Sequence, residues 1–118
     1  MNNLAVLVNS CDAYENVWDA FFKMFFRFWE KCNCPVYLNT ETKDFSFRDR
    51  SINCLHFQGN KGAWSKRLLN ALQSIEEDFI LMFLDDFILE EPVNDDRLKK
   101  MINILVQLFM MPCLNLTF

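Results

Sequence analysis

The residues best suited to chemistry are two adjacent aspartates at the end of an apolar run. Residues 79–84 are six apolar side chains in succession, and Asp85 and Asp86 follow them directly. A run of this length is typical of a buried strand and is too short to cross a membrane. Two neighbouring carboxylates repel each other unless a proton or a cation lies between them. A divalent metal that carries a phosphate ligand would satisfy both carboxylates.

The same doublet has a simpler interpretation. Two aspartates after a strand can form a solvated turn or the acidic cap of the next helix. An isolated Asp-Asp pair is a weak motif, so its spacing alone does not decide between a metal site and a turn. The elements that position the doublet must therefore be considered with it.

The composition indicates one domain with more apolar residues than its own core needs. The chain has 118 residues, of which 52% are hydrophobic, and 13 are Phe. This length suits a single domain with a substantial core. We expect the surplus apolar surface to meet a second copy of the chain, a membrane surface or a neighbouring segment that this sequence lacks.

Charge and cysteine content restrict the compartment and the partners. The net charge is −4 and the basic residues are scattered, which argues against a nucleic-acid partner. The N-terminus has no basic stretch before an apolar block, so we expect no signal peptide. Five cysteines at irregular spacing are typical of reduced thiols. We therefore expect a cytoplasmic protein, located at the inner membrane surface if its apolar surface meets lipid.

Cys32 and Cys34 offer an alternative metal site. Cys32 and Cys34 are close enough in sequence to share an ion, but no second ligand pair accompanies them. The chain has only one His, so a zinc site would be hard to complete.

Apolar runs and turn residues predict alternating strands and helices. Strands are expected at 4–9, 35–40, 52–57, 79–84 and 113–118, and helices at 15–31, at 63–77 and from 95 until Pro112 stops the last one. The first helix has a stripe that should be buried, formed by Trp18, Phe21, Phe22, Phe25 and Trp29. The third helix should begin at the N-cap Asn94 and bury Leu98, Met101, Ile102, Leu105 and Phe109.

This order predicts an α/β fold over residues 1–118. It corresponds to a Rossmann-like three-layer sandwich, with a mostly parallel sheet of four to five strands and helices on both faces. Right-handed crossovers bring the carboxyl ends of the first and fourth strands to one crevice. Those ends carry Ser10 and Asp12 on one side and the Asp85-Asp86 doublet on the other, and the second strand adds Asn39.

The turn at 59–64 opens the second helix of this crevice. Free N–H groups at a helix start are a natural phosphate site, and Lys61, Lys66 and Arg67 add positive charge. The crevice therefore has the groups that a nucleoside diphosphate and a bridging metal need. No G-x-G-x-x-G or Walker A sequence is present, so dinucleotide and P-loop sites lack their fingerprints.

The chain resembles the nucleotide-sugar-binding half of a GT-A-type glycosyltransferase, and the resemblance covers nearly all of it. It rests on Asn9-Ser10-Cys11-Asp12-Ala13-Tyr14, Trp18, Pro35-Val36-Tyr37-Leu38, Gly62-Ala63-Trp64-Ser65, Leu68-Leu69, Phe83-Leu84-Asp85-Asp86-Phe87 and Pro92-Val93. The segment around Asp85 and Asp86 looks like a variant of that family's Asp-x-Asp metal motif. Here the two acids are adjacent instead of being separated by one residue.

The resemblance implies binding of a nucleoside-diphosphate sugar together with Mn²⁺ or Mg²⁺, both of which take oxygen ligands. It places Asp86 at the metal and Asp85 at the metal or the ribose. The ion would neutralise the diphosphate leaving group during sugar transfer to a glycan or a lipid-linked acceptor, in polysaccharide or glycan synthesis. The implied donor contacts are Asn9, Ser10, Asp12, Asn39, Trp64, Lys66, Arg67 and Asp85.

The resemblance does not extend to the region that binds the sugar acceptor in such enzymes. In such enzymes the acceptor site and any catalytic base lie beyond the metal motif, and few residues follow Asp86. The acids found there fit loop and helix-cap positions better than a general base, and they are Glu90, Glu91, Asp95 and Asp96. The catalytic residues are therefore unknown, and the chain resembles a truncated enzyme or an isolated half.

Two other functions stay open at this point. The first is a non-catalytic nucleotide-sugar-binding or assembly module that keeps the fold without the acceptor half. The second is a receiver-type signalling domain whose acids bind Mg²⁺ for another purpose. A receiver would need an Asp after the third strand, where this sequence has Phe57-Gln58-Gly59.

Overall fold

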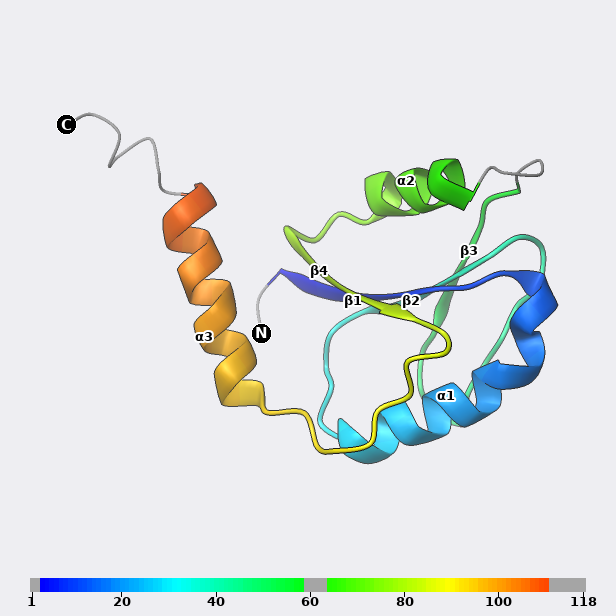
Figure 1. The fold of residues 1–118 in the computed structure, drawn as a ribbon, viewed down its shortest axis with the longest axis horizontal. Coiled ribbons are helices and arrows are strands. Elements are labelled where there is room, and N and C mark those ends of the chain that lie inside the picture. The colour runs from blue at the N-terminus through cyan, green and yellow to red at the C-terminus, as the bar shows by residue number, and fades with distance from the viewer. Residues whose placement is uncertain (1–2, 59–63, 111–118) are drawn as a thin grey trace.

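The computed structural model describes residues 3–58 and 64–110 as a four-stranded, all-parallel sheet with helices on both faces (Figure 1). The strands are β1 (Leu4–Asn9), β2 (Val36–Thr40), β3 (Asn53–His56) and β4 (Phe79–Leu84). Their order across the sheet is β3-β2-β1-β4. The predicted α/β fold is confirmed for this part of the chain. The predicted fifth strand at 113–118 lies outside the described residues.

The helix α1 (Glu15–Phe28) covers one face of the sheet with aromatic side chains. Its predicted apolar stripe is buried, since Trp18, Phe21, Phe22, Phe25 and Trp29 are at most 2% exposed. Edge-to-face contacts join this stripe to β4, with the rings of Phe21 and Phe83 6.0 Å apart. The main core of the protein is therefore the α1 layer, which fixes β1 and β4 against one helix.

The helix α2 (Trp64–Ser74) covers the opposite face. It packs Ala71 and the nearby Ile75 against Ala5 and Leu7, which point to that side of β1. Because successive side chains of a strand point to opposite faces, β1 supplies both cores and is buried along its whole length. The 3₁₀ turn η1 (Asp12–Tyr14) connects β1 to α1.

The helix α3 (Asp95–Leu105) begins as predicted and then leaves the domain (Figure 1). Asn94 is its N-cap, and its side-chain oxygen accepts a hydrogen bond from the Arg97 N–H at 3.0 Å. The indole N–H of Trp29 donates to Asp95 at 3.0 Å and attaches the helix start to the end of α1. The π-helical turn η2 (Val106–Met110) continues the helix.

The predicted burial of the α3 stripe is wrong for Met101 and Leu105, and the burial of Phe109 lies outside what the structure describes. Leu98 and Ile102 contact the main core, but Met101 is 58% exposed and Leu105 is 37% exposed. The periodicity of these residues identifies one apolar face, but it does not specify a neighbour for that face. The described part of the stripe therefore reaches the core through Leu98 and Ile102.

The ends of two helices differ from the prediction by a few residues. The helix α1 ends at Phe28 instead of residue 31, and the Phe28 carbonyl accepts a hydrogen bond from the Val93 N–H at 2.9 Å. The helix α2 ends at Ser74 instead of residue 77.

None of the helices in the described part of the chain combines the length and the apolar character that crossing a bilayer requires.

Candidate functional site

The acidic doublet lies where the prediction placed it, at the carboxyl edge of the sheet beside the end of β1. The two strands run in parallel, and their register pairs Asn9 with Leu84 at the last position. Ser10 and Asp85 therefore leave the sheet side by side. Asp85 is partly buried and Asp86 is exposed.

A chain of hydrogen bonds orients Asp85. The indole N–H of Trp18 donates to the Ser10 hydroxyl at 2.8 Å. Since the hydroxyl accepts from the indole, its own proton is free to point to Asp85, whose Oδ2 lies 2.5 Å away. Trp18 is 1% exposed and belongs to the core stripe of α1. The position of this carboxylate is thus determined by the packing of α1 on β1.

The doublet lines an open pocket of about 390 Å³. The predicted donor contacts Asn9, Ser10, Trp64 and Asp85 line it, together with the predicted metal ligand Asp86. The remaining lining residues come from the start of α1, its preceding turn and the end of β4, and they are Cys11, Tyr14, Val17 and Leu84. Tyr14 and Trp64 are 56% and 55% exposed, so two aromatic side chains flank two acids.

Asp12 is directed to a loop and does not line this pocket. Its carboxylate accepts hydrogen bonds from the backbone N–H groups of 41–43 and from the Thr42 hydroxyl. The Glu41 carboxylate accepts a hydrogen bond from the backbone N–H of Asp12 at 3.1 Å. Burial alone would raise the pKa of Asp12, but these hydrogen bonds outweigh it and lower the pKa to about 2. Asp12 joins the ends of β1 and β2.

Asn39 also lies beneath the pocket and not in its lining. Its side-chain NH₂ donates to the side-chain oxygen Oδ1 of Asn9 at 2.8 Å, and Asn39 is 0% exposed. The Asn39 side-chain oxygen has no hydrogen-bond partner among the described residues. Asn39 therefore supports Asn9 from below, and Asn9 is the amide that reaches the pocket.

Arg67 and Lys66 were predicted near phosphate, and neither lines the pocket. Arg67 is 5% exposed and donates to three backbone carbonyls, with Nε on Phe57 at 2.6 Å and Nη2 on Ser10 at 3.2 Å and Thr40 at 3.0 Å. These carbonyls lie at the ends of three strands, so Arg67 holds the carboxyl edge of the sheet together. Lys66 is exposed.

Asp85 and Asp86 offer carboxylate oxygens, the type of ligand that a divalent ion would use if it also bound the phosphates of a substrate. Mg²⁺ usually keeps several waters and needs one or two carboxylates plus substrate phosphates, and Mn²⁺ also prefers oxygen ligands. Asp85 and Asp86 supply two carboxylates beside the Asn9 amide. Residues 3–58 and 64–110 hold no group of three or more His, Cys, Asp or Glu that could bind an ion. Among the described residues that line the pocket, Asp85 and Asp86 are thus the two carboxylates that an ion could use, and any further ligands would have to come from water or from a bound substrate.

The cysteine alternative has little support from the geometry. Burial raises the pKa of Cys32 to about 11, and burial also raises the pKa of Cys34. Among the described residues, no group of three or more His, Cys, Asp or Glu surrounds them that could complete a metal site. Cys32 instead contacts the Cys34 carbonyl oxygen, with its sulfur at 4.0 Å.

Sequence reasoning missed two residues of this site. Tyr14 entered only through the resemblance, and Trp18 entered through the resemblance and the core stripe, so neither was predicted as a residue of this site. The sequence signal for Trp18 is its indole N–H, because a buried indole needs a hydrogen-bond acceptor and the polar residue Ser10 directly follows the neighbouring strand β1.

No protein-family model, curated protein or solved structure matches this chain.

Proposed function

We propose that this chain binds a nucleoside-diphosphate sugar through a divalent cation and acts as the donor-binding part of a glycosyltransferase. The Asp85-Asp86 doublet would hold Mn²⁺ or Mg²⁺ against the diphosphate. A bound ion supplies Lewis-acid stabilisation of the diphosphate that leaves when the sugar is transferred. The acceptor would be a glycan or a lipid-linked sugar.

The observation that supports this proposal is the hydrogen bond from Ser10 to Asp85. It brings the acidic doublet into contact with the turn after β1, although 75 residues separate the two in sequence. In open α/β sheets, ligands bind at this edge, outside the carboxyl ends of the strands. Here β1 leads to α1 and the pocket lies between β1 and β4.

The remaining lining groups suit the organic part of such a ligand. The exposed rings of Tyr14 and Trp64 can stack on a nucleobase or on the apolar face of a sugar. The Asn9 amide can donate to and accept from ribose or base. Arg67 is not assigned to the phosphates, because its guanidinium is already engaged with backbone carbonyls.

The first experiment measures metal-dependent binding of a panel of nucleoside-diphosphate sugars by calorimetry. We expect binding in Mn²⁺ or Mg²⁺, little binding in a chelator, and a loss of at least about tenfold in Asp86→Asn, since one charged ligand contact is removed. The control is Asp78→Asn, which removes the same charge from an exposed residue just before β4, at the other end of that strand. Equal weakening by both variants would contradict the proposal.

A non-catalytic binding module is the second candidate function. It is favoured by the acid content of the pocket, where Asp85 and Asp86 are the only carboxylates among the described lining residues. If both of them bind the metal, neither is free to act as a general base. Turnover of a bound donor, followed as release of nucleoside diphosphate, distinguishes the two: transfer or slow hydrolysis supports the enzyme, and binding without turnover supports the module.

A further inference from the structure

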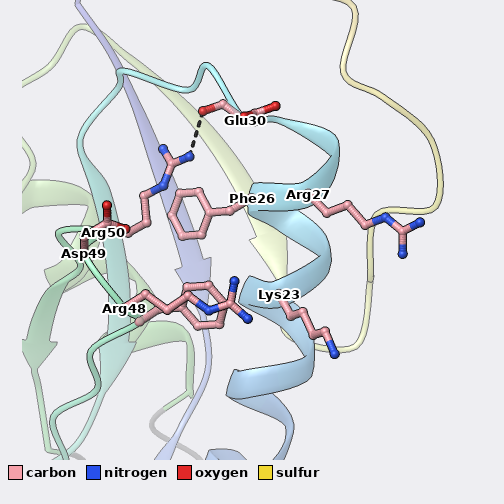
Figure 2. A pocket seen from close by; sticks show the side chains of 8 residues that line it. Lys23, Phe26, Arg27, Glu30, Arg48, Asp49 and Arg50 are labelled. Carbon is pink, nitrogen blue, oxygen red and sulfur yellow. Dashed lines mark hydrogen bonds between the residues drawn. The ribbon is translucent and has the colours of Figure 1, made fainter.

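A second cleft, of about 440 Å³, lies between α1 and the loop before β3 (Figure 2). It shares no lining residue with the Asp85 pocket. The helix side contributes Lys23, Phe26, Arg27 and Glu30, and the loop side contributes Phe47, Arg48, Asp49 and Arg50. Four basic side chains and two acidic ones thus line one cleft in a chain whose net charge is −4.

Two of these arginines are stacked on aromatic rings. The Arg50 guanidinium lies over the Phe26 ring, 4.7 Å from its centroid, and the Arg48 guanidinium lies over the Phe47 ring at 5.1 Å. The two rings stack on each other with centroids 5.8 Å apart. Both rings are nearly buried, so they form a fixed base for the two guanidinium groups. Stacking of this kind holds the planar fork of an arginine in one orientation.

The backbone at Arg48 is in the left-handed region, with a φ of 50°. This conformation is uncommon for a residue with a long side chain, and glycine or asparagine adopts it at lower cost. The conformation places the Arg48 side chain over Phe47, and Figure 2 shows it extending toward α1. Strain of this kind often marks a functional position.

The cations of the cleft have no carboxylate partner among the described residues. The ion pairs that the structure gives join Lys43 to Glu15 and His56 to Asp44, all outside this cleft. Arg50 donates to the Glu30 backbone carbonyl at 2.8 Å, which fixes its position without neutralising its charge. The acids Glu30 and Asp49 line the same cleft but form no ion pair with these arginines.

We infer that this cleft binds a phosphate group through Arg48 and Arg50. An arginine fork matches phosphate oxygens in a bidentate manner, and a phosphate monoester carries close to two negative charges against two guanidinium groups. A carboxylate has two oxygens and is satisfied by one fork. A phosphate has three free oxygens and can accept from two forks at once. Arg27 and Lys23 line the cleft but are not included, because both side chains extend away from the Arg48 and Arg50 guanidinium groups in Figure 2, and the Arg27 guanidinium lies over the Phe28 ring.

The test is a titration of the whole chain with inorganic phosphate and with pyrophosphate, in chelator so that the Asp85 pocket cannot contribute. Shifts of the Arg48 and Arg50 Nε–Hε resonances report binding at the cleft. In Arg48→Asn, which tolerates the left-handed backbone, we expect affinity to fall by about tenfold, the equivalent of one charge-assisted hydrogen bond. Arg48→Lys keeps the charge without the fork, and we expect it to be weakened as well.

The control is Arg97→Asn, because Arg97 is an exposed arginine on α3 that does not line the cleft. It should bind phosphate as the parent chain does. Retained affinity in Arg48→Asn, or an equal loss in Arg97→Asn, would overturn the inference, since binding would then depend on overall charge. A thermal melt of each variant confirms that the fold is intact.

A further arm identifies the source of the phosphate group. Vesicles of phosphatidylcholine with a phosphoinositide are compared with pure phosphatidylcholine vesicles in a sedimentation assay. Phosphoinositide-dependent sedimentation that Arg48→Asn abolishes assigns the cleft to a lipid headgroup. Binding of the free anions without sedimentation assigns it to a phosphorylated small molecule.

Discussion

At the scale of single residues, Asp12 shows how a predicted ligand contact can have a structural role. Its carboxylate accepts from three consecutive backbone N–H groups and one hydroxyl across the gap between the first two strands. Hydrogen bonds to an ionised carboxylate stabilise the charged form, and this explains the lowered pKa.

This pKa predicts an acid-dependent loss of stability. The pKa of Asp12 is lowered from 3.8 to about 2 in the folded chain, so its contribution is fully present above pH 4 or so and is lost as the pH falls toward 2. Asp12→Asn should lower the free energy of unfolding by about 1–2 kcal/mol at neutral pH, with a smaller difference in acid. Urea unfolding of both proteins across this pH range measures the effect. An unchanged difference in acid would contradict it.

At the scale of elements, β1 and β4 were readable from sequence as continuous apolar runs, although β1 is buried on both faces whereas the edge strand β4 is only partly buried, with Met82 44% exposed. The predicted bounds of β1 and β4 match the structure, and the core stripe of α1 was predicted residue by residue. The stripe of α3 has the same periodicity, yet much of it is exposed. Periodicity describes a helix face, and the neighbour of that face is decided by tertiary contacts.

We therefore expect substitutions on α1 and α3 to differ strongly in their effect. Phe22→Ala should cost about 3–5 kcal/mol of unfolding free energy, because Phe22 is 0% exposed within the aromatic core. Ile104→Gln should change it by less than about 0.5 kcal/mol, because Ile104 is 56% exposed. Urea unfolding measures both. A large loss in Ile104→Gln would mean that this face of α3 is covered in solution.

The candidate site was predictable only in part. Ser10 and Asp85 could be brought together from topology, since both follow parallel strands that end at one edge. The roles of Asp12 and Arg67 could not, because their partners are backbone groups distant in sequence, which carry no residue-type signal. Arginine is also rarely buried, so its type suggested a phosphate contact instead of a position inside the fold.

At the scale of the whole molecule, Arg67 connects the two layers that flank the candidate site. It reaches from α2 to the carbonyl ends of β1, β2 and β3, so one side chain fixes four elements. A residue with this number of buried partners is expected to affect global stability, although it contacts no ligand in the proposed function.

Arg67→Met should lower the free energy of unfolding by about 2–4 kcal/mol, because three backbone carbonyls lose a charged donor and two of these bonds are buried. The adjacent Lys66→Met is the matched control, since Lys66 is exposed and should change stability by less than about 0.5 kcal/mol. Chemical denaturation measures both. Similar values for the two variants would show that the carbonyls find other partners.

The strand order also determines when the acidic pocket can form in a growing polypeptide. The inner strand β1 is made first, and its neighbour β4 emerges from the ribosome only after the other two strands and both flanking helices. Synthesis proceeds from the N-terminus, so β1, β2 and β3 can associate while one side of β1 is still open. The two halves of the candidate site, which carry Ser10 and Asp85, meet only when β4 closes that side. A ligand of this pocket could therefore be captured only after β4 has left the ribosome.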